Sequence, residues 1–367
     1  MKSHVRGRIS RIGNLSIKLS KLACAENVRG QLDGELGVDL ALRFERLAQP
    51  DDLDGSISSL QNAVHLLSDG HLKKPFYYFT LGHCQRVRFE RIGELLDLQG
   101  AIHNLEKAVL LTNEGDPKKP IYIGNLGIGQ MTRYEHLGEP LDLNDAMSSL
   151  QTAVQTAENE HPDKPVFLGN LGISQMRQYE RHSKLTDIED SISNILNAVR
   201  LTDDTHPDKP QYLSNLGVSH LKRHQHLGEQ VDVEESIWNL QKAVQLTQDG
   251  SPRKPRYLFT LAYSQRVRFE SCGELMDIDN AISNLQNAAQ QIDDQHPDKP
   301  MHLANLGMCQ LRRYERLCKQ VDIEDSITNL QNAVQLTDDS HPDRVVHLSN
   351  LEISQQKHSE CLGKLGL

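Results

Sequence analysis

The 367-residue sequence is poor in aromatic residues, cysteine and long hydrophobic runs. Aromatic residues make up 5% of the chain and hydrophobic residues 37%, which favours thin helical layers over one thick globular core. No stretch approaches the roughly 20 apolar residues of a transmembrane helix, so we predict no membrane partner. The six cysteines form no CxxC motif and follow no period. This usage argues against a disulfide framework or zinc site and favours a reducing, cytoplasmic compartment.

The net charge is acidic, at −10. An acidic surface argues against general nucleic-acid binding, because neutralising phosphates requires Lys and Arg. Residues 1–29 differ, with seven Lys or Arg against one acid. A mitochondrial targeting segment is one interpretation of this start. The other, which we favour, is a helix of a repeat array, because Ile12 and Leu15 stand 45 residues before Ile57 and Leu60.

A 45-residue period runs along nearly the whole chain. It is marked by successive prolines: Pro75, Pro120, Pro165, Pro210, Pro255 and Pro300. Such a period is the signature of a solenoid, in which each unit packs on its neighbours. We predict a half repeat at 1–30, seven full repeats over 31–345 and a half repeat at 346–367. Residues 45 apart are called a column below.

The two half repeats are expected to be caps. Lys18 stands in a column that otherwise holds alanine, and Glu352 stands in a column of glycine. Polar residues at such positions are what a solenoid needs on its outer faces. The alternative, a piece of a longer array whose ends have drifted, stays open.

Each repeat reads as two helices. The first begins near the proline and ends at a glycine or small residue such as Gly138. It contains a recurring Leu–Gly pair, as at Leu126–Gly127, with Ala262 replacing the glycine once. Glycine costs a helix about 1 kcal/mol relative to alanine. We therefore expect these glycines to lie where two helices approach too closely for a side chain.

The second helix is expected to begin at an aspartate that all seven full repeats share. An aspartate there accepts hydrogen bonds from free backbone N–H groups and favours the positive helix end, so we predict helix caps rather than catalytic carboxylates. The predicted caps are Asp52, Asp97, Asp142, Asp187, Asp232, Asp277 and Asp322. Alanine fills a later column of this helix from Ala63 to Ala333, which indicates a second close contact.

An arginine column lies near the end of the first helix. Its members are Arg43, Arg88, Arg133, Arg223, Arg268 and Arg313. Two interpretations are open: recognition of acidic peptides, or pairing with the aspartates and glutamates of the same array. We favour the second.

No motif of known chemistry is present. The sequence holds no GK[ST] phosphate loop, HExxH or GxSxG. His220 and His224 share a helix face, but their columns hold Gln and aromatic residues elsewhere. The recurrent histidines of the links, such as His161 and His296, have no second ligand at fixed spacing. We predict no enzyme, no catalytic residue, no metal and no cofactor.

These residues resemble the tetratricopeptide repeat superfamily. The order Leu126–Gly127, Gly138, Ala146, Leu150, Ala153 follows its pattern, although the unit is longer than the usual 34 residues. The repeat text is similar to fungal arrays that often precede a CHAT (caspase-like) protease domain. The resemblance implies an all-α, right-handed α-solenoid of helix–turn–helix repeats that binds a protein or peptide partner. It also implies an alternative, a sensor or regulatory module of a CHAT protease system whose effector domain lies C-terminal in a longer relative.

By the same resemblance, the first helices line the binding groove. Two of them stand out because the hexapeptide QRVRFE occurs at 85–90 and again at 265–270. Aromatic residues with arginine are typical interface anchors. The predicted groove residues are Phe79, His83, Arg86, Glu90, Phe259, Tyr263, Arg266, Glu270, Met308 and Arg312. Alternatively, Phe79 and Phe259 only fill space between neighbouring repeats.

Overall fold

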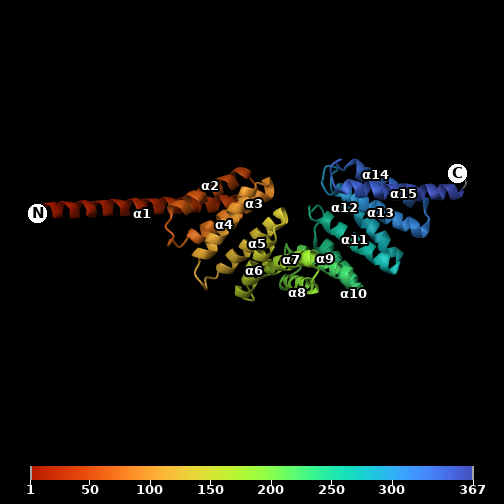
Figure 1. The fold of residues 1–367 in the computed structure, drawn as a ribbon, viewed down its shortest axis with the longest axis horizontal. Helices are drawn as coiled ribbons and strands as arrows, with labels where there is room; N and C mark the ends of the chain where they lie inside the picture. The colour runs from red at the N-terminus through yellow and green to blue at the C-terminus, as the bar shows by residue number, and fades with distance from the viewer. Residues whose placement is uncertain (1, 366–367) are drawn as a thin grey trace. The chain divides into compact units, whose positions relative to one another are not determined.

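The computed structural model describes the backbone of residues 2–365 and the side chains of residues 24–360. Within this part of the chain, all regular structure is α-helical (Figure 1). The helices are α1 (Lys2–Leu47), α2 (Pro50–Leu66), α3 (Lys74–Ile92), α4 (Leu95–Leu111), α5 (Lys119–Leu137), α6 (Pro140–Thr156), α7 (Lys164–His182), α8 (Leu185–Leu201), α9 (Lys209–Leu227), α10 (Gln230–Leu246), α11 (Lys254–Cys272), α12 (Leu275–Gln290), α13 (Lys299–Leu317), α14 (Gln320–Gln335) and α15 (Asp343–Leu365).

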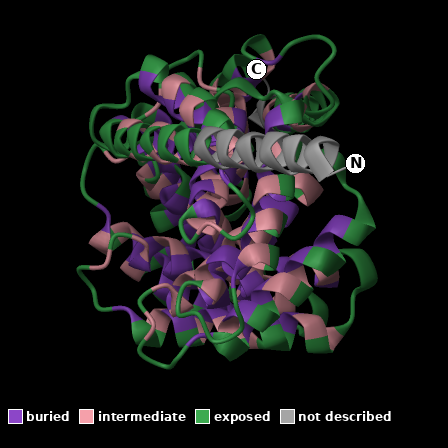
Figure 2. Cartoon of the chain, turned by 90° about the vertical axis from the view of Figure 1, so that its left-hand side faces the viewer, coloured by how far each residue is buried: buried purple, intermediate pink, exposed green. Residues whose placement is uncertain are grey.

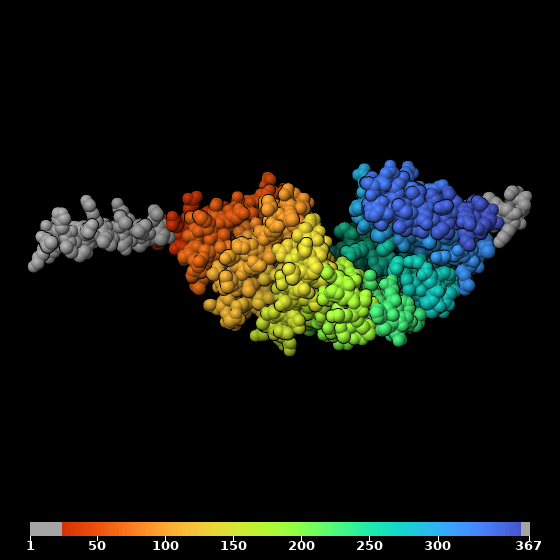
Figure 3. All heavy atoms as spheres, viewed as in Figure 1, coloured from red at the N-terminus to blue at the C-terminus, as the bar shows by residue number. Residues whose placement is uncertain are grey.

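The chain forms two compact units, Met1–Ser174 and Gln175–Leu367, whose boundary lies inside α7. In the first unit, α3 pairs with α4 and α5 with α6, and each of α3 and α5 also packs on the second helix of the preceding repeat. The second unit has the same arrangement from α8 to α15. Each repeat therefore lies beside its sequence neighbours within its unit, as the colours in Figure 3 show.

The predicted period and helix pairing are confirmed in both units. The first helices α3, α5, α9, α11 and α13 begin 45 or 90 residues apart, and each carries a proline in its first turn. They end at a residue with left-handed backbone, such as Gly138 at φ 72°. Ala48, Ser183 and Cys318 adopt the same conformation without being glycine, at φ 52°, 54° and 50°.

The glycines of the Leu–Gly pairs lie at close helix contacts, as predicted. A Cβ on Gly82 would stand 2.8 Å from Leu105 Cγ and 2.9 Å from the Ala101 carbonyl oxygen. A Cβ on Gly127 would stand 2.7 Å from Leu150 Cγ. The alanine column of the second helix is fully buried. Figure 2 shows the buried residues gathered where helices face one another, with the links mostly exposed.

The prediction that seven aspartates cap the second helices is wrong. Each second helix begins two residues earlier, and no side chain caps its first turn. The aspartates Asp52, Asp97, Asp142, Asp187, Asp232, Asp277 and Asp322 lie in the first turn itself. The physical reason is a stronger partner: six of them accept hydrogen bonds from arginines of the first helix, as described below.

The two ends differ from the internal repeats. The predicted boundary at residue 30 lies inside α1, which continues to Leu47 because no polar, proline-containing link interrupts it. Leu36, the leucine of the first Leu–Gly pair, is 52% exposed. Glu352 in α15 is exposed, and the C-terminal cap stays a prediction. The side chains of Ile12, Leu15 and Lys18 lie outside the described residues, so the N-terminal cap and the targeting segment stay predictions.

Candidate binding site

The first predicted group, Phe79, His83, Arg86 and Glu90 on α3, is called station 1. Phe79 is half-buried and stacks on Tyr122 of the next first helix, with ring centroids 4.9 Å apart and planes at 29°. The His83 ring lies 6.5 Å from the Phe79 ring. These rings form an aromatic stack that crosses from α3 to α5 and ends on the buried Tyr122.

The charged members of station 1 are already paired. Arg86 forms an ion pair with Glu90 one turn later in α3, and its side chain is only 15% exposed. His83 Nε2 lies 3.9 Å from Glu45 Oε1 of α1. Burial, with a smaller contribution from Arg86, lowers the pKa of His83 to about 4. His83 is therefore neutral near pH 7, and Glu90 is the exposed charge of this station.

The second group, Phe259, Tyr263, Arg266 and Glu270 on α11, is called station 2. Phe259 stacks on His302 of α13, with centroids 4.9 Å apart and planes at 18°. The Arg266 guanidinium lies over the Tyr263 ring at 4.9 Å, and its Nη1 donates to Glu270 Oε1 at 2.5 Å. The duplicated hexapeptide thus builds the same Arg–Glu pair twice, and a stacked phenylalanine outside it, Phe79 or Phe259, accompanies each pair.

Met308 and Arg312 of α13 complete the predicted set. Arg312 Nε lies 3.8 Å from Glu270 Oε1, and its Nη1 donates to Glu315 Oε2 at 2.9 Å. Met308 is half-buried and packs on the core of its own repeat. The structure therefore brings Arg312 to station 2, whereas it leaves Met308 in a packing role.

The stations depart from the other repeats in a definite way. Where Phe79 stands in α3, α5 has Gly124, and a Cβ on Gly124 would lie 2.2 Å from the Phe167 ring. Where Arg86 stands, α5 has the buried Met131. In α5, which has no station, the ring of Phe167 from the next first helix therefore lies over Gly124. In station 1, the ring of Tyr122 from the next first helix lies over Phe79. The sequence analysis missed this aromatic column, although its period was readable: Tyr77, Tyr122, Phe167, Tyr212, Tyr257, His302 and His347.

The arginine column pairs with the aspartates of the same array, which confirms the favoured interpretation. The Nε of each arginine donates to Oδ2 of the aspartate nine residues later, at 2.7 to 3.1 Å, in all six repeats that have the arginine. The Arg43 guanidinium holds the pKa of the Asp52 carboxyl below its ordinary value. Burial raises the pKa of Asp232, but hydrogen bonds from Arg223 and His220 outweigh it and lower the pKa overall.

A lysine column that the sequence analysis missed joins successive repeats. Lys209 Nζ donates to the Val199 and Thr202 carbonyl oxygens at the end of α8, both at 2.6 Å. Lys119, Lys164, Lys254 and Lys299 make the equivalent bond, at 2.9 to 3.1 Å, and Arg344 does so in the last repeat. Cations at a helix C-terminus satisfy its free carbonyls. The signal was the Lys–Pro pair that recurs in every link except the last.

The histidines considered as metal ligands have other partners. His220 Nδ1 lies 2.9 Å from Asp232 Oδ1, and His224 Nδ1 lies 2.8 Å from the Glu229 carbonyl oxygen. In the links, His161 Nδ1 accepts a hydrogen bond from the Asp163 backbone N–H, and His206, His296 and His341 accept the equivalent bond. Among the described residues, no three His, Cys, Asp or Glu side chains are grouped to hold a metal ion.

No protein-family model and no curated protein match the chain, but solved structures match its fold. The C-terminal part of a tetratricopeptide repeat-containing protein from Cytophaga hutchinsonii matches with 13% identity and a TM-score of 0.50, covering 84% of this chain and 99% of that one. BtubC from P. vanneervenii has 16% identity, a TM-score of 0.47 and coverages of 65% and 90%. A putative kinesin light chain with TPR-like repeats from Podosopora anserina has 14% identity and a TM-score of 0.45. The match covers 60% of this chain and 96% of that one. The chain thus has the helical-repeat fold of tetratricopeptide proteins.

None of the described helices is long and apolar enough to cross a membrane.

Proposed function

We propose that this chain is a non-enzymatic scaffold that binds a protein or peptide partner through its first helices, and that the two stations are its contact points. The observation that carries the proposal is the pair of Arg–aromatic clusters on α3 and α11. In the same columns, the plain helix α5 has Gly124 and the buried Met131. Aromatic and arginine side chains are the usual anchors of interfaces.

The internal packing of each unit supports such a function physically. The Arg–Asp pairs within repeats and the Lys–carbonyl bonds between them hold the first helices in place before a partner arrives. A preformed surface loses little conformational entropy on binding, so more of the contact energy appears as affinity. The partner we propose is an extended peptide or a helix, since each station is a row of side chains along one helix.

The test is a variant in which both stations are rebuilt as plain repeats. Phe79→Ala and Phe259→Ala replace each phenylalanine with alanine, which is the residue at the same column in α13 (Ala304). Arg86→Met and Arg266→Met replace each arginine with methionine, which is the residue at the same column in α5 (Met131). Because each phenylalanine stacks on a buried ring, the four changes should lower the melting temperature, and circular dichroism should show that the variant is still folded at the assay temperature.

Partners captured by the parent chain should be lost by this variant. The matched control is His103→Ala with Trp238→Ala, two exposed positions on second helices, and it should keep them. A station variant that folds and retains every partner at parental affinity would refute the proposal for these residues. Loss of the partners in both variants would also contradict it.

The second candidate is the sensor or regulatory module of a CHAT protease system. It is favoured by the resemblance of the 45-residue repeat sequence to fungal arrays that precede such proteases. A contiguous CHAT-like reading frame downstream of Leu367 in the genome would support it, and an in-frame stop without such a domain would count against it. In either case we propose a cytoplasmic location, based on the cysteine usage, rather than a mitochondrial one.

A further inference from the structure

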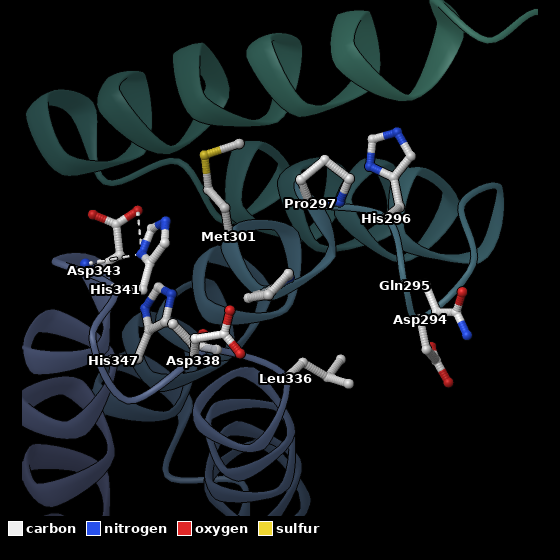
Figure 4. Close-up of a pocket in the computed structure, with 12 residues that line it drawn as sticks. Asp294, Gln295, His296, Pro297, Met301, Leu336, Asp338, His341, Asp343 and His347 are labelled. Carbon is white, nitrogen blue, oxygen red and sulfur yellow. Dashed lines mark hydrogen bonds and ion pairs between the residues drawn. The ribbon is translucent and has the colours of Figure 1, made fainter. Parts of the chain in front are cut away.

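A cavity of about 390 Å³ lies in the second unit, between the α12–α13 link and the α14–α15 link. Figure 4 shows Asp338, His341, Asp343 and His347 together at one end and Asp294, Gln295 and His296 at the other. Met301, Pro297 and Leu336 supply an apolar wall. The cavity thus combines carboxylates, imidazoles and a hydrophobic surface.

Equivalent crevices between earlier repeats already contain a cation from the protein. Lys119 lines the crevice between the α4–α5 link and the α6–α7 link, and Arg253 lines the one between the α8–α9 link and the α10–α11 link. Arg253 and Asp343 stand in the same column, two repeats apart, so the last crevice has an aspartate where the earlier one has an arginine. No Lys or Arg is among the described residues that line the last crevice. Asp294 pairs with Lys299, whose Nζ lies 3.1 Å from its Oδ1, whereas the Asp338 carboxylate at the other end has no Lys or Arg partner among the described residues.

His347 supplies a second, independent observation. It is 6% exposed, lines the cavity, and its Nδ1 is buried without a hydrogen-bond partner. A buried polar atom without a partner costs free energy, and a ligand that donates a hydrogen bond would remove that cost. Burial lowers the pKa of His347, which keeps its ring neutral and able to accept. Asp338 lies beside it, exposed, and its carboxylate bonds to no other described residue (Figure 4).

We propose that this cavity binds the guanidinium group of an arginine side chain presented by a partner peptide. Arginine offers five N–H donors in a rigid plane, enough to reach His347 Nδ1 and a neighbouring carboxylate at the same time. The flat guanidinium and its methylene stem pack against Met301 and Pro297. The Asp338 and Asp343 carboxylates balance its charge.

The site does not depend on the stations, and a small ligand tests it separately. The probe is N-acetyl-arginine amide, and N-acetyl-citrulline amide is its uncharged match in shape. Titration of the full chain by calorimetry, with amide shifts of α13 to α15 followed by NMR, should show saturable arginine binding in the millimolar range. The citrulline probe should bind at least tenfold more weakly.

Two single variants locate the binding. Asp338→Asn removes an exposed carboxylate without disturbing the core, and His347→Phe introduces the residue that the same column has as Phe167. Each should weaken arginine binding about tenfold. Asp203→Asn, three repeats earlier in the column of Asp338, should leave it unchanged. Absence of saturable binding, equal binding of the two probes, or unchanged binding by the Asp338→Asn variant would overturn the proposal.

Discussion

Arg133 in α5 and Asp142 in α6 join the two helices of one repeat. Arg133 Nε donates to Asp142 Oδ2 at 2.9 Å, and Nη2 donates to Oδ1 at 2.5 Å. The same pair occurs in every full repeat except the fourth, where Gln178 holds the arginine position. There, Oδ2 of Asp187 is buried without a partner. One repeat of the array therefore lacks its internal ion pair.

Gln178→Arg should stabilise the protein. The new guanidinium would reach Asp187 as Arg133 reaches Asp142, and a charge-assisted bond to a buried carboxylate contributes about 1.5 to 3 kcal/mol. Chemical denaturation should show a higher free energy of unfolding by about 1 to 2 kcal/mol, after the entropy of ordering the side chain.

The matched control removes the Arg133–Asp142 ion pair in the third full repeat. Arg133→Gln should destabilise by about 2 kcal/mol, because it leaves the Asp142 carboxylate buried and unpaired. Asp187→Asn should abolish most of the gain from Gln178→Arg. If Gln178→Arg stabilises equally with Asp187→Asn present, the pair is not the cause.

Lys209 should matter for its length and charge at the end of α8. Lys209→Met leaves the Thr202 carbonyl without its lysine donor, while Val199 keeps the Thr202 Oγ1 donor at 3.2 Å, and the loss should cost about 2 kcal/mol in the free energy of unfolding. Lys209→Arg should be nearly neutral, because Arg344 donates to the Val334 carbonyl oxygen at 2.6 Å in the last repeat. Denaturation midpoints of the two variants give the comparison. Equal destabilisation by both would contradict the assigned role.

The repeat, the helix pairs and the close glycine contacts were predictable because they leave a periodic pattern of residue types. The pairing of the arginine column with the aspartates was also favoured from the sequence, but the same aspartates were assigned to helix caps, and the sequence did not decide between the two partners. Asp142 in a first helical turn has two possible partners, backbone N–H groups or a side chain on another helix. The choice depends on how closely α5 approaches α6 near Arg133, and a single sequence does not contain that distance.

The stations illustrate the same limit. The repeated hexapeptide identified Arg86 and Arg266, but their sequence context gives no measure of burial. In the structure both form ion pairs with glutamates of the same helix. The stacking partners Tyr122 and His302 come from the next repeat, so they follow only from the packing of successive first helices.

Two glycines in α5 should respond oppositely to alanine. A Cβ on Gly127 would lie 2.7 Å from Leu150 Cγ, so Gly127→Ala should destabilise by about 1 to 3 kcal/mol. A Cβ on Gly129 would lie 3.4 Å from Ile102 Cγ1, an ordinary contact. Gly129→Ala should stabilise by up to about 1 kcal/mol through helix propensity. Thermal and denaturant unfolding of the two variants checks the difference, and a stable Gly127→Ala protein would refute the close contact.

His302 should make the second unit sensitive to acid. The ring is buried against Phe259, and its Nδ1 has no partner. Burial lowers the pKa of His302 to about 4, with Asp298 raising it and His296 lowering it by smaller amounts. In the unfolded chain the pKa is about 6.5.

The unfolded state therefore binds the proton first as pH falls. The stability due to neutral His302 is fully present above about pH 6.5 and is lost as pH falls toward 4, by about 3 kcal/mol. His302→Tyr replaces the histidine with tyrosine, which is the residue at the same column one repeat earlier (Tyr257), and removes this titration. Free energies of unfolding measured from pH 7.5 to 4.5 should diverge between parent and variant below pH 6.5, with the variant losing less. Parallel curves would mean that His302 does not titrate in this range, since all other groups are common to both proteins.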